Sequence, residues 1–204
     1  MNKFIEILLY AVIFLIILFS AIACFSQVKY ELPCRSDLLC LSKNIAISQI
    51  GTKELTGNND GPEIEKYLKS VGLNPKGKYP YCAAGQYWSF RTACDSLKIS
   101  RREIPIKKTA LANGVFDDAQ KRGKKIAYIP EINDLLVWKI INKWTGHIER
   151  TIKVGKAGWI ICVGFNTGSS NPREGGSVRK VKRNIYHPLS RFLRVRGLIG
   201  FNAK

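Results

Sequence analysis

The stretch CAAGQYWSFRTACDSL, residues 82–97, combines good helix formers with apolar side chains at helical spacing. It follows Pro80 closely, and a proline at the start of such a pattern is a signal that a helix begins. The pattern therefore predicts a helix over these residues, with Cys82 in its first turn.

Around this helix the hydrophobic spacing divides the chain into a helical and a strand-like part. We expect helices near residues 38–50 and 64–71, and another near 109–122 that ends at Gly123. Short runs rich in β-branched and aromatic residues then predict strands at 126–129, 135–141, 147–154, 159–166 and 178–185, and a closing segment at 192–201. Helices followed by strands indicate an α+β fold, with N-terminal helices packed on an antiparallel β-sheet.

The chain has 204 residues, which suits one compact domain behind an N-terminal targeting segment. The turn-rich residues 56–62, TGNNDGP, mark the entry to that domain. We therefore expect residues 1–24 to be a signal peptide or membrane anchor, residues 25–60 a linker or N-terminal extension, and residues 61–204 the main domain.

The N-terminus indicates export. Residues 7–23 form an uncharged, mainly apolar run, with a length between that of a signal-peptide core and that of a short membrane span. Ala21-Ile22-Ala23 fits a cleavage site, and together with Cys24 it also resembles a loose lipobox, in which Cys24 is lipidated. A cleaved signal, a lipoprotein and an uncleaved anchor all put the remaining chain outside the cytoplasm, as a periplasmic, envelope-anchored or secreted protein.

The charge of the chain indicates a polyanionic partner. Its 33 Lys and Arg residues outnumber 15 Asp and Glu residues, which gives a formal net charge of +18. Because an exported protein meets the cell envelope, we expect anionic envelope polymers or lipids as partners and do not expect nucleic acid.

The six cysteines, at positions 24, 34, 40, 82, 94 and 162, form no CxxC pair and no zinc spacing. We therefore expect no metal and no cofactor. In an oxidising compartment Cys34 and Cys40 are close enough in sequence to close a small disulfide loop. Cys94 and Cys162 are expected to be small apolar residues of the core.

Cys82 differs from these two because the start of a helix stabilises a thiolate through unpaired N–H groups and the helix dipole. A nucleophilic cysteine needs a base, and the chain has only His147 and His187. His147 opens a predicted strand, whereas His187 precedes a proline in a predicted loop. The sequence therefore favours Cys82 as nucleophile and His147 as base.

A third residue must orient the imidazole of His147. If the hairpin between strands 147–154 and 159–166 has an even-numbered loop, Asn166 lies on the same face as His147. A three-residue loop breaks this parity, and Glu149, two residues from His147, is then the alternative.

Four short motifs in this order resemble those of CHAP and NlpC/P60 cysteine amidases and peptidases. They are Pro80-Tyr81-Cys82-Ala83-Ala84, Asn133-Asp134-Leu135-Leu136-Val137-Trp138, Gly146-His147 and Gly164-Phe165-Asn166-Thr167. The resemblance covers residues 61–201. It differs from the family pattern at Gly164, where a glutamate is common, and at Asn133, where a glycine precedes the aspartate.

The resemblance implies a papain-like catalytic domain over residues 61–204 and a peptidoglycan hydrolase. With the N-terminal export signal, we expect this enzyme to be exported, and we expect it to be a monomer. Such an enzyme cuts amide or peptide bonds of cell-wall stem peptides by a Cys-His mechanism, with the Cys82 backbone N–H as one oxyanion donor. The alternative is a non-catalytic protein that binds peptidoglycan or another anionic polymer of the envelope.

Overall fold

The structure is a computed structural model that describes residues 3, 5–10, 12–14, 27–168 and 176–203. The expected cleavage site and Cys24 lie outside the described residues. Within the described part of the chain, no helix is both long enough and apolar enough to cross a bilayer.

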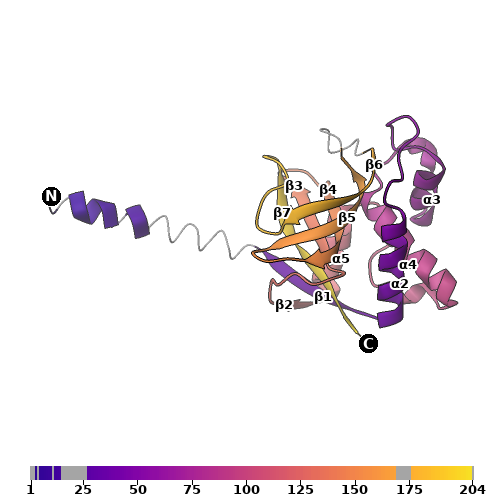
Figure 1. The fold of residues 1–204 in the computed structure, drawn as a ribbon, viewed down its shortest axis with the longest axis horizontal. Helices are drawn as coiled ribbons and strands as arrows, with labels where there is room; N and C mark the ends of the chain where they lie inside the picture. Colours follow the sequence, from indigo (N-terminus) through magenta and orange to yellow (C-terminus); the bar gives the residue numbers. More distant parts are fainter. Residues whose placement is uncertain (1–2, 4, 11, 15–26, 169–175, 204) are drawn as a thin grey trace.

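Four helices and seven strands make up the domain (Figure 1). The helices are α2 (Ser36–Ser48), α3 (Pro62–Ser70), α4 (Cys82–Leu97) and α5 (Ala112–Arg122), with short 3-10 turns at Pro75–Gly77 and Arg101–Glu103. The strands are β1 (Val28–Cys34), β2 (Lys124–Ile126), β3 (Leu135–Ile140), β4 (Gly146–Val154), β5 (Trp159–Thr167), β6 (Ser177–Asn184) and β7 (Leu193–Ala203). The expected α+β class is therefore confirmed.

The strands form one sheet in the order β2-β1-β7-β3-β4-β5-β6. All neighbours are antiparallel except β1 and β7, which run parallel from Val28 opposite Gly197 to Cys34 opposite Ala203. The expectation of a purely antiparallel sheet is thus wrong at this pair. Side-chain alternation within a strand carries no information on the direction of a partner that is distant in sequence.

Residues 25–60 need a correction, because the described part of this expected linker belongs to the domain. It supplies β1 to the sheet and α2 to the helical layer, and Leu32 and Leu38 are buried in the main core. The sequence did not predict this strand because Lys29, inside β1, has the charge of a surface residue. Its ammonium group is nevertheless buried and pairs with Asp134 at 2.9 Å.

Local signals end the helices where the sequence indicates. Helix α3 begins with Pro62, and the chain leaves it through Gly72, whose φ of +86° favours glycine. Helix α4 spans the predicted residues 82–97, and α5 stops before Gly123.

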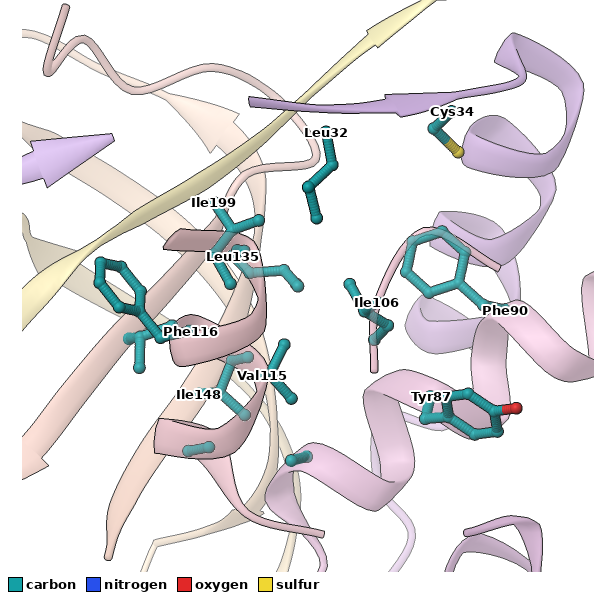
Figure 2. Close-up of a cluster of buried hydrophobic side chains, with 14 of the residues drawn as sticks. Leu32, Cys34, Tyr87, Phe90, Ile106, Val115, Phe116, Leu135, Ile148 and Ile199 are labelled. Atoms are coloured by element: carbon teal, nitrogen blue, oxygen red, sulfur yellow. The ribbon is translucent and has the colours of Figure 1, made fainter. Parts of the chain in front are cut away.

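The main core lies between the sheet and the helices. In Figure 2, side chains from β1, β3, β4 and β7 approach side chains of α4 and α5; the labelled members include Leu32, Leu135, Ile148, Ile199, Phe90 and Phe116. Strand β3 is buried on both faces, because Leu136 and Trp138 belong to a second cluster with Ile160, Cys162, Ile185, Leu193 and Leu198. Figure 1 shows α2, α3 and α4 together beside the sheet.

Replacing Lys29 by Met should lower the free energy of unfolding by on the order of 3 kcal/mol, because the buried Asp134 carboxylate loses its partner. Burial already raises the pKa of Asp134 to about 6, and Lys29 opposes that rise. Urea unfolding at neutral pH measures the loss. Lys125→Met, at an exposed position of the neighbouring strand β2, is the matched control; equal midpoints for the two variants would contradict an integral β1.

Candidate active site

Cys82 is the first residue of α4, and its side chain is 4% exposed. The N-cap residue, Tyr81, makes no side-chain hydrogen bond to the first turn, so the first backbone N–H groups of the helix remain available to an anion. Gly85 allows a close approach to β5, since a Cβ atom there would lie 2.2 Å from the Phe165 ring. The start of α4 is thus fixed against the sheet.

His147 is the second residue of β4 and is 9% exposed. It pairs with Trp138 of β3, and the two ring centroids are 5.9 Å apart. Burial lowers the pKa of His147, but hydrogen bonds with the side chains of Cys82 and Glu149 outweigh it and raise the pKa to about 9. The imidazole therefore carries a proton at neutral pH and lies beside the thiol of Cys82.

Glu149 is fully buried and binds this imidazole, with its Oε1 atom 3.0 Å from Nε2 of His147. Arg183 of β6 donates two hydrogen bonds to the same carboxylate, from Nε to Oε2 at 2.9 Å and from Nη2 to Oε1 at 2.7 Å. Burial opposes ionisation of Glu149, but the hydrogen bonds from His147 and Arg183 outweigh it and lower the pKa of this group. The result is a buried, ionised carboxylate between two cations.

Gly164 makes room for this carboxylate. It lies opposite Glu149 in the pairing of β4 with β5. A Cβ atom at Gly164 would lie 2.9 Å from Cγ and Oε1 of Glu149 and 2.6 Å from Oγ1 of Thr167. No other residue type fits at this position without displacing one of these groups.

The hairpin between β4 and β5 explains where Asn166 lies. Gly155 N–H donates to the carbonyl of Trp159 at 2.8 Å and closes a three-residue loop. An irregularity between Thr151 and Lys153 then shifts the register by one residue, so Glu149 lies opposite Gly164, as a four-residue loop would place it. A second irregularity, in the pairing of β5 with β6, lies between Gly164 and Thr167.

Asn166 lies in the second irregularity, where its φ of +54° is in the left-handed region. Asn166 is buried, and the next residue, Thr167, places its Oγ1 atom 3.2 Å from Nε2 of His147. The same hydroxyl donates to the carbonyl of Phe165, which leaves it as the acceptor toward His147. The structure thus brings Cys82, His147 and Glu149 together, and Thr167 adds a further contact to the imidazole of His147.

Sequence reasoning did not identify Thr167 and Arg183 as parts of the site. Arg183 belongs to the basic strand β6, and alternation along this strand places Arg183 on the same side as Val181, which packs in the second core cluster. A glycine opposite Glu149 was the available signal that a buried group needed space there.

The other candidate residues lie elsewhere. His187 is exposed in the turn after β6. Cys94 and Cys162 are buried, as expected of core residues, and burial raises the pKa of both thiols. Cys40 is exposed and forms no disulfide with another described cysteine, so the expected Cys34–Cys40 bridge is absent. Among the described residues, no cluster of three or more His, Cys, Asp or Glu side chains could hold a metal ion.

The raised pKa of His147 predicts a pH dependence of stability. Because the folded state holds this proton more tightly than the unfolded state, the stabilisation is complete below the usual histidine pKa of 6.5 and is lost as the pH rises through about 9. Urea midpoints measured from pH 6 to pH 9.5 should fall more steeply for the wild type than for His147→Gln. Parallel curves for the two proteins would show that His147 is not the responsible group.

Comparisons of the chain with protein-family models, with curated proteins and with solved structures found no match.

Proposed function

We propose that this protein is a cysteine amidase or peptidase in which Cys82 is the nucleophile and His147 the proton carrier. The observation that supports this most directly is the interaction of the Cys82 side chain, at a helix start, with an imidazole that is protonated at neutral pH. A thiolate beside an imidazolium is the reactive form of cysteine hydrolases. Glu149, which Arg183 holds in place, orients the imidazole.

The proposed reaction has two halves. The Cys82 thiolate attacks the carbonyl carbon of the amide, and the backbone N–H of Cys82 donates to the oxyanion that forms. His147 then protonates the leaving amine while the C–N bond breaks, which leaves a thioester and a neutral imidazole. The imidazole takes a proton from water, the hydroxide attacks the thioester, and the thiolate leaves as the carboxylic acid product is released.

Glu149 fixes the direction of the imidazole in both halves. Because Nε2 already lies next to Glu149 and Thr167, we assign the other ring nitrogen, Nδ1, to the Cys82 side. An ionised carboxylate also stabilises the imidazolium that the first half requires.

A papain-like NlpC/P60-type fold is part of the proposal. It is supported by a nucleophile helix packed on a sheet and by the chain order Cys82, His147 and then β5. The two departures from the motifs of that family have structural explanations. Asn133 replaces a glycine at a φ of +82°, a conformation that asparagine tolerates better than most residues. Gly164 replaces a glutamate, and the residue paired with Gly164 across the strands is Glu149. In this chain the carboxylate beside the imidazole of His147 thus comes from β4.

The proposed substrate is a stem peptide of peptidoglycan, cut outside the cytoplasm. Support comes from the motif resemblance, from the apolar N-terminal sequence and from the net charge of +18, which suits an anionic envelope. The protein acts as a monomer in this proposal and needs no metal or cofactor, because thiolate and imidazole supply the chemistry.

Cys82→Ala should abolish the release of soluble fragments from purified sacculi, because no other group near His147 replaces the nucleophile. Mass analysis of the digest identifies which bond the wild type cuts. Cys40→Ala, at an exposed cysteine away from His147, is the matched control and should digest normally. A folded Cys82→Ala protein, checked by circular dichroism, that still digests sacculi would end the cysteine-hydrolase proposal, and a wild type that binds sacculi without cutting them would favour the non-catalytic alternative.

Three variants test the orienting role. Glu149→Gln should lower kcat by roughly 100-fold or more, because it removes the charge that holds the imidazolium. Thr167→Val should cost roughly 10-fold, the loss of one neutral hydrogen bond. Asn166→Gly, which keeps a left-handed backbone without the amide, should have the smallest effect.

The pH profile separates orientation from mere damage to the fold. In wild-type enzyme the activity should decline as the pH rises through about 9, where His147 loses its proton. Glu149→Gln should move that decline to lower pH, since one of the interactions that raise the pKa of His147 is gone. An unchanged profile in Glu149→Gln, or a deeper kcat defect in Asn166→Gly, would return the orienting role to Asn166.

A further inference from the structure

Three loops next to the candidate site carry large apolar side chains that are exposed to solvent. Leu111 precedes α5, Ile141 and Trp144 lie in the β3–β4 turn, and Phe192 precedes β7. Trp144 is 67% exposed and Phe192 is 56% exposed. We call these four residues the loop patch.

Hydrogen bonds to backbone carbonyls join the three loops into one surface. Ile141 N–H donates to the carbonyl of Phe192 at 3.0 Å. Asn113, two residues after Leu111, donates from Nδ2 to the carbonyl of Trp144 at 2.8 Å and to that of Thr145 at 3.0 Å. The four apolar side chains therefore project from neighbouring backbone segments.

The surroundings of the loop patch are positively charged. Residues 107–113, 139–146 and 187–194 contain no Asp or Glu. Their exposed basic residues are Lys107, Lys108, Lys139, Lys143, Arg191 and Arg194. The guanidinium group of Arg191 lies 4.4 Å from the centroid of the Phe192 ring, so a cationic group and an aromatic group lie next to each other on the surface.

We propose that the loop patch docks on the surface of a membrane that contains anionic lipid. Trp and Phe side chains favour the boundary between headgroups and acyl chains, and the basic residues around them attract anionic headgroups. An anionic polysaccharide would engage the basic residues but would leave four apolar side chains in water, so it explains only half of the surface.

Docking would place the candidate active site at the membrane surface. Trp144 is three residues before His147, and Val115, on the helix that carries Asn113, packs in the same core cluster as Cys82. An enzyme held this way reaches substrates close to the bilayer. The docking itself does not depend on Cys82 being a nucleophile.

The test must report on Trp144 alone, because the apolar residues 7–23 of the full chain are themselves expected to bind lipid. The full chain is mixed with vesicles of equal parts phosphatidylglycerol and phosphatidylcholine whose acyl chains carry bromine, a short-range quencher of tryptophan. The difference in fluorescence between the wild type and Trp144→Phe isolates the signal of Trp144. We expect that signal to fall by roughly half, as for a ring at the headgroup–acyl boundary.

The variants separate the apolar and the electrostatic parts. Phe192→Ser and the pair Lys143→Gln with Arg191→Gln should reduce the quenching of Trp144, and so should high salt or vesicles of phosphatidylcholine alone. Leu55→Ser is the matched control for Phe192→Ser, since Leu55 is 77% exposed but lies outside the loop patch. Lys125→Gln is the control for charge, and Cys82→Ala should dock like the wild type.

Three outcomes overturn the proposal. The first is a protein that sediments with the vesicles while Trp144 remains unquenched, which would mean that the N-terminal segment alone binds lipid. The second is quenching that is equal on neutral vesicles and insensitive to salt. The third is a Trp144 signal that responds to soluble polyphosphate but not to brominated lipid, which would assign the patch to a polymer. If the wild type does not digest sacculi although brominated lipid quenches Trp144, the proposed enzyme activity is contradicted and the docking proposal still holds.

Discussion

The carboxylate of Glu149 has no access to solvent, and the protein must balance its charge from within. Arg183 does so with two hydrogen bonds and His147 with a third. This single requirement ties together β4 and β6 across the intervening β5, and it forces a glycine at position 164. It also keeps the proton on His147 that the proposed chemistry uses. Removing either cation leaves the buried carboxylate with only one cationic partner, so the site and the stability of the sheet are not independent.

Most of the fold was predictable because helix and strand periods are local properties. The helix from Cys82 and the strands β3 to β6 follow directly from hydrophobic spacing. Strand β1 was missed for two reasons. Its buried Lys29 looks like a surface residue until Asp134 is known to lie beside it, and its partner β7 is at the other end of the chain. Such pairings follow from the packing of the whole domain, which no short window of sequence contains.

The candidate site was predictable to the extent that the chain offered few choices. Two histidines and one cysteine at a helix start led to Cys82 and His147, and an interaction with the Cys82 side chain raises the pKa of His147. The orienting residue depends on the length of one loop and on two irregularities in strand pairing. The hydrophobic pattern of the sequence predicts neither the loop length nor the irregularities. Alternation along β6 separates Arg183 from its exposed neighbours, but the sequence does not show that its partner is the buried carboxylate of Glu149.

The parallel pairing of β1 with β7 also constrains how the chain folds. The first strand of the domain finds its partner only when the last strand exists, so the contact closes a loop that contains nearly the whole domain. Closing a loop of that length has a high entropic cost, and contacts between such distant residues slow folding. The hairpins from β3 to β6 are local and can form early, whereas the edge made of β2, β1 and β7 must assemble late. The chain therefore completes its sheet only after the residues of β7 have been synthesised and are free to pair with β1.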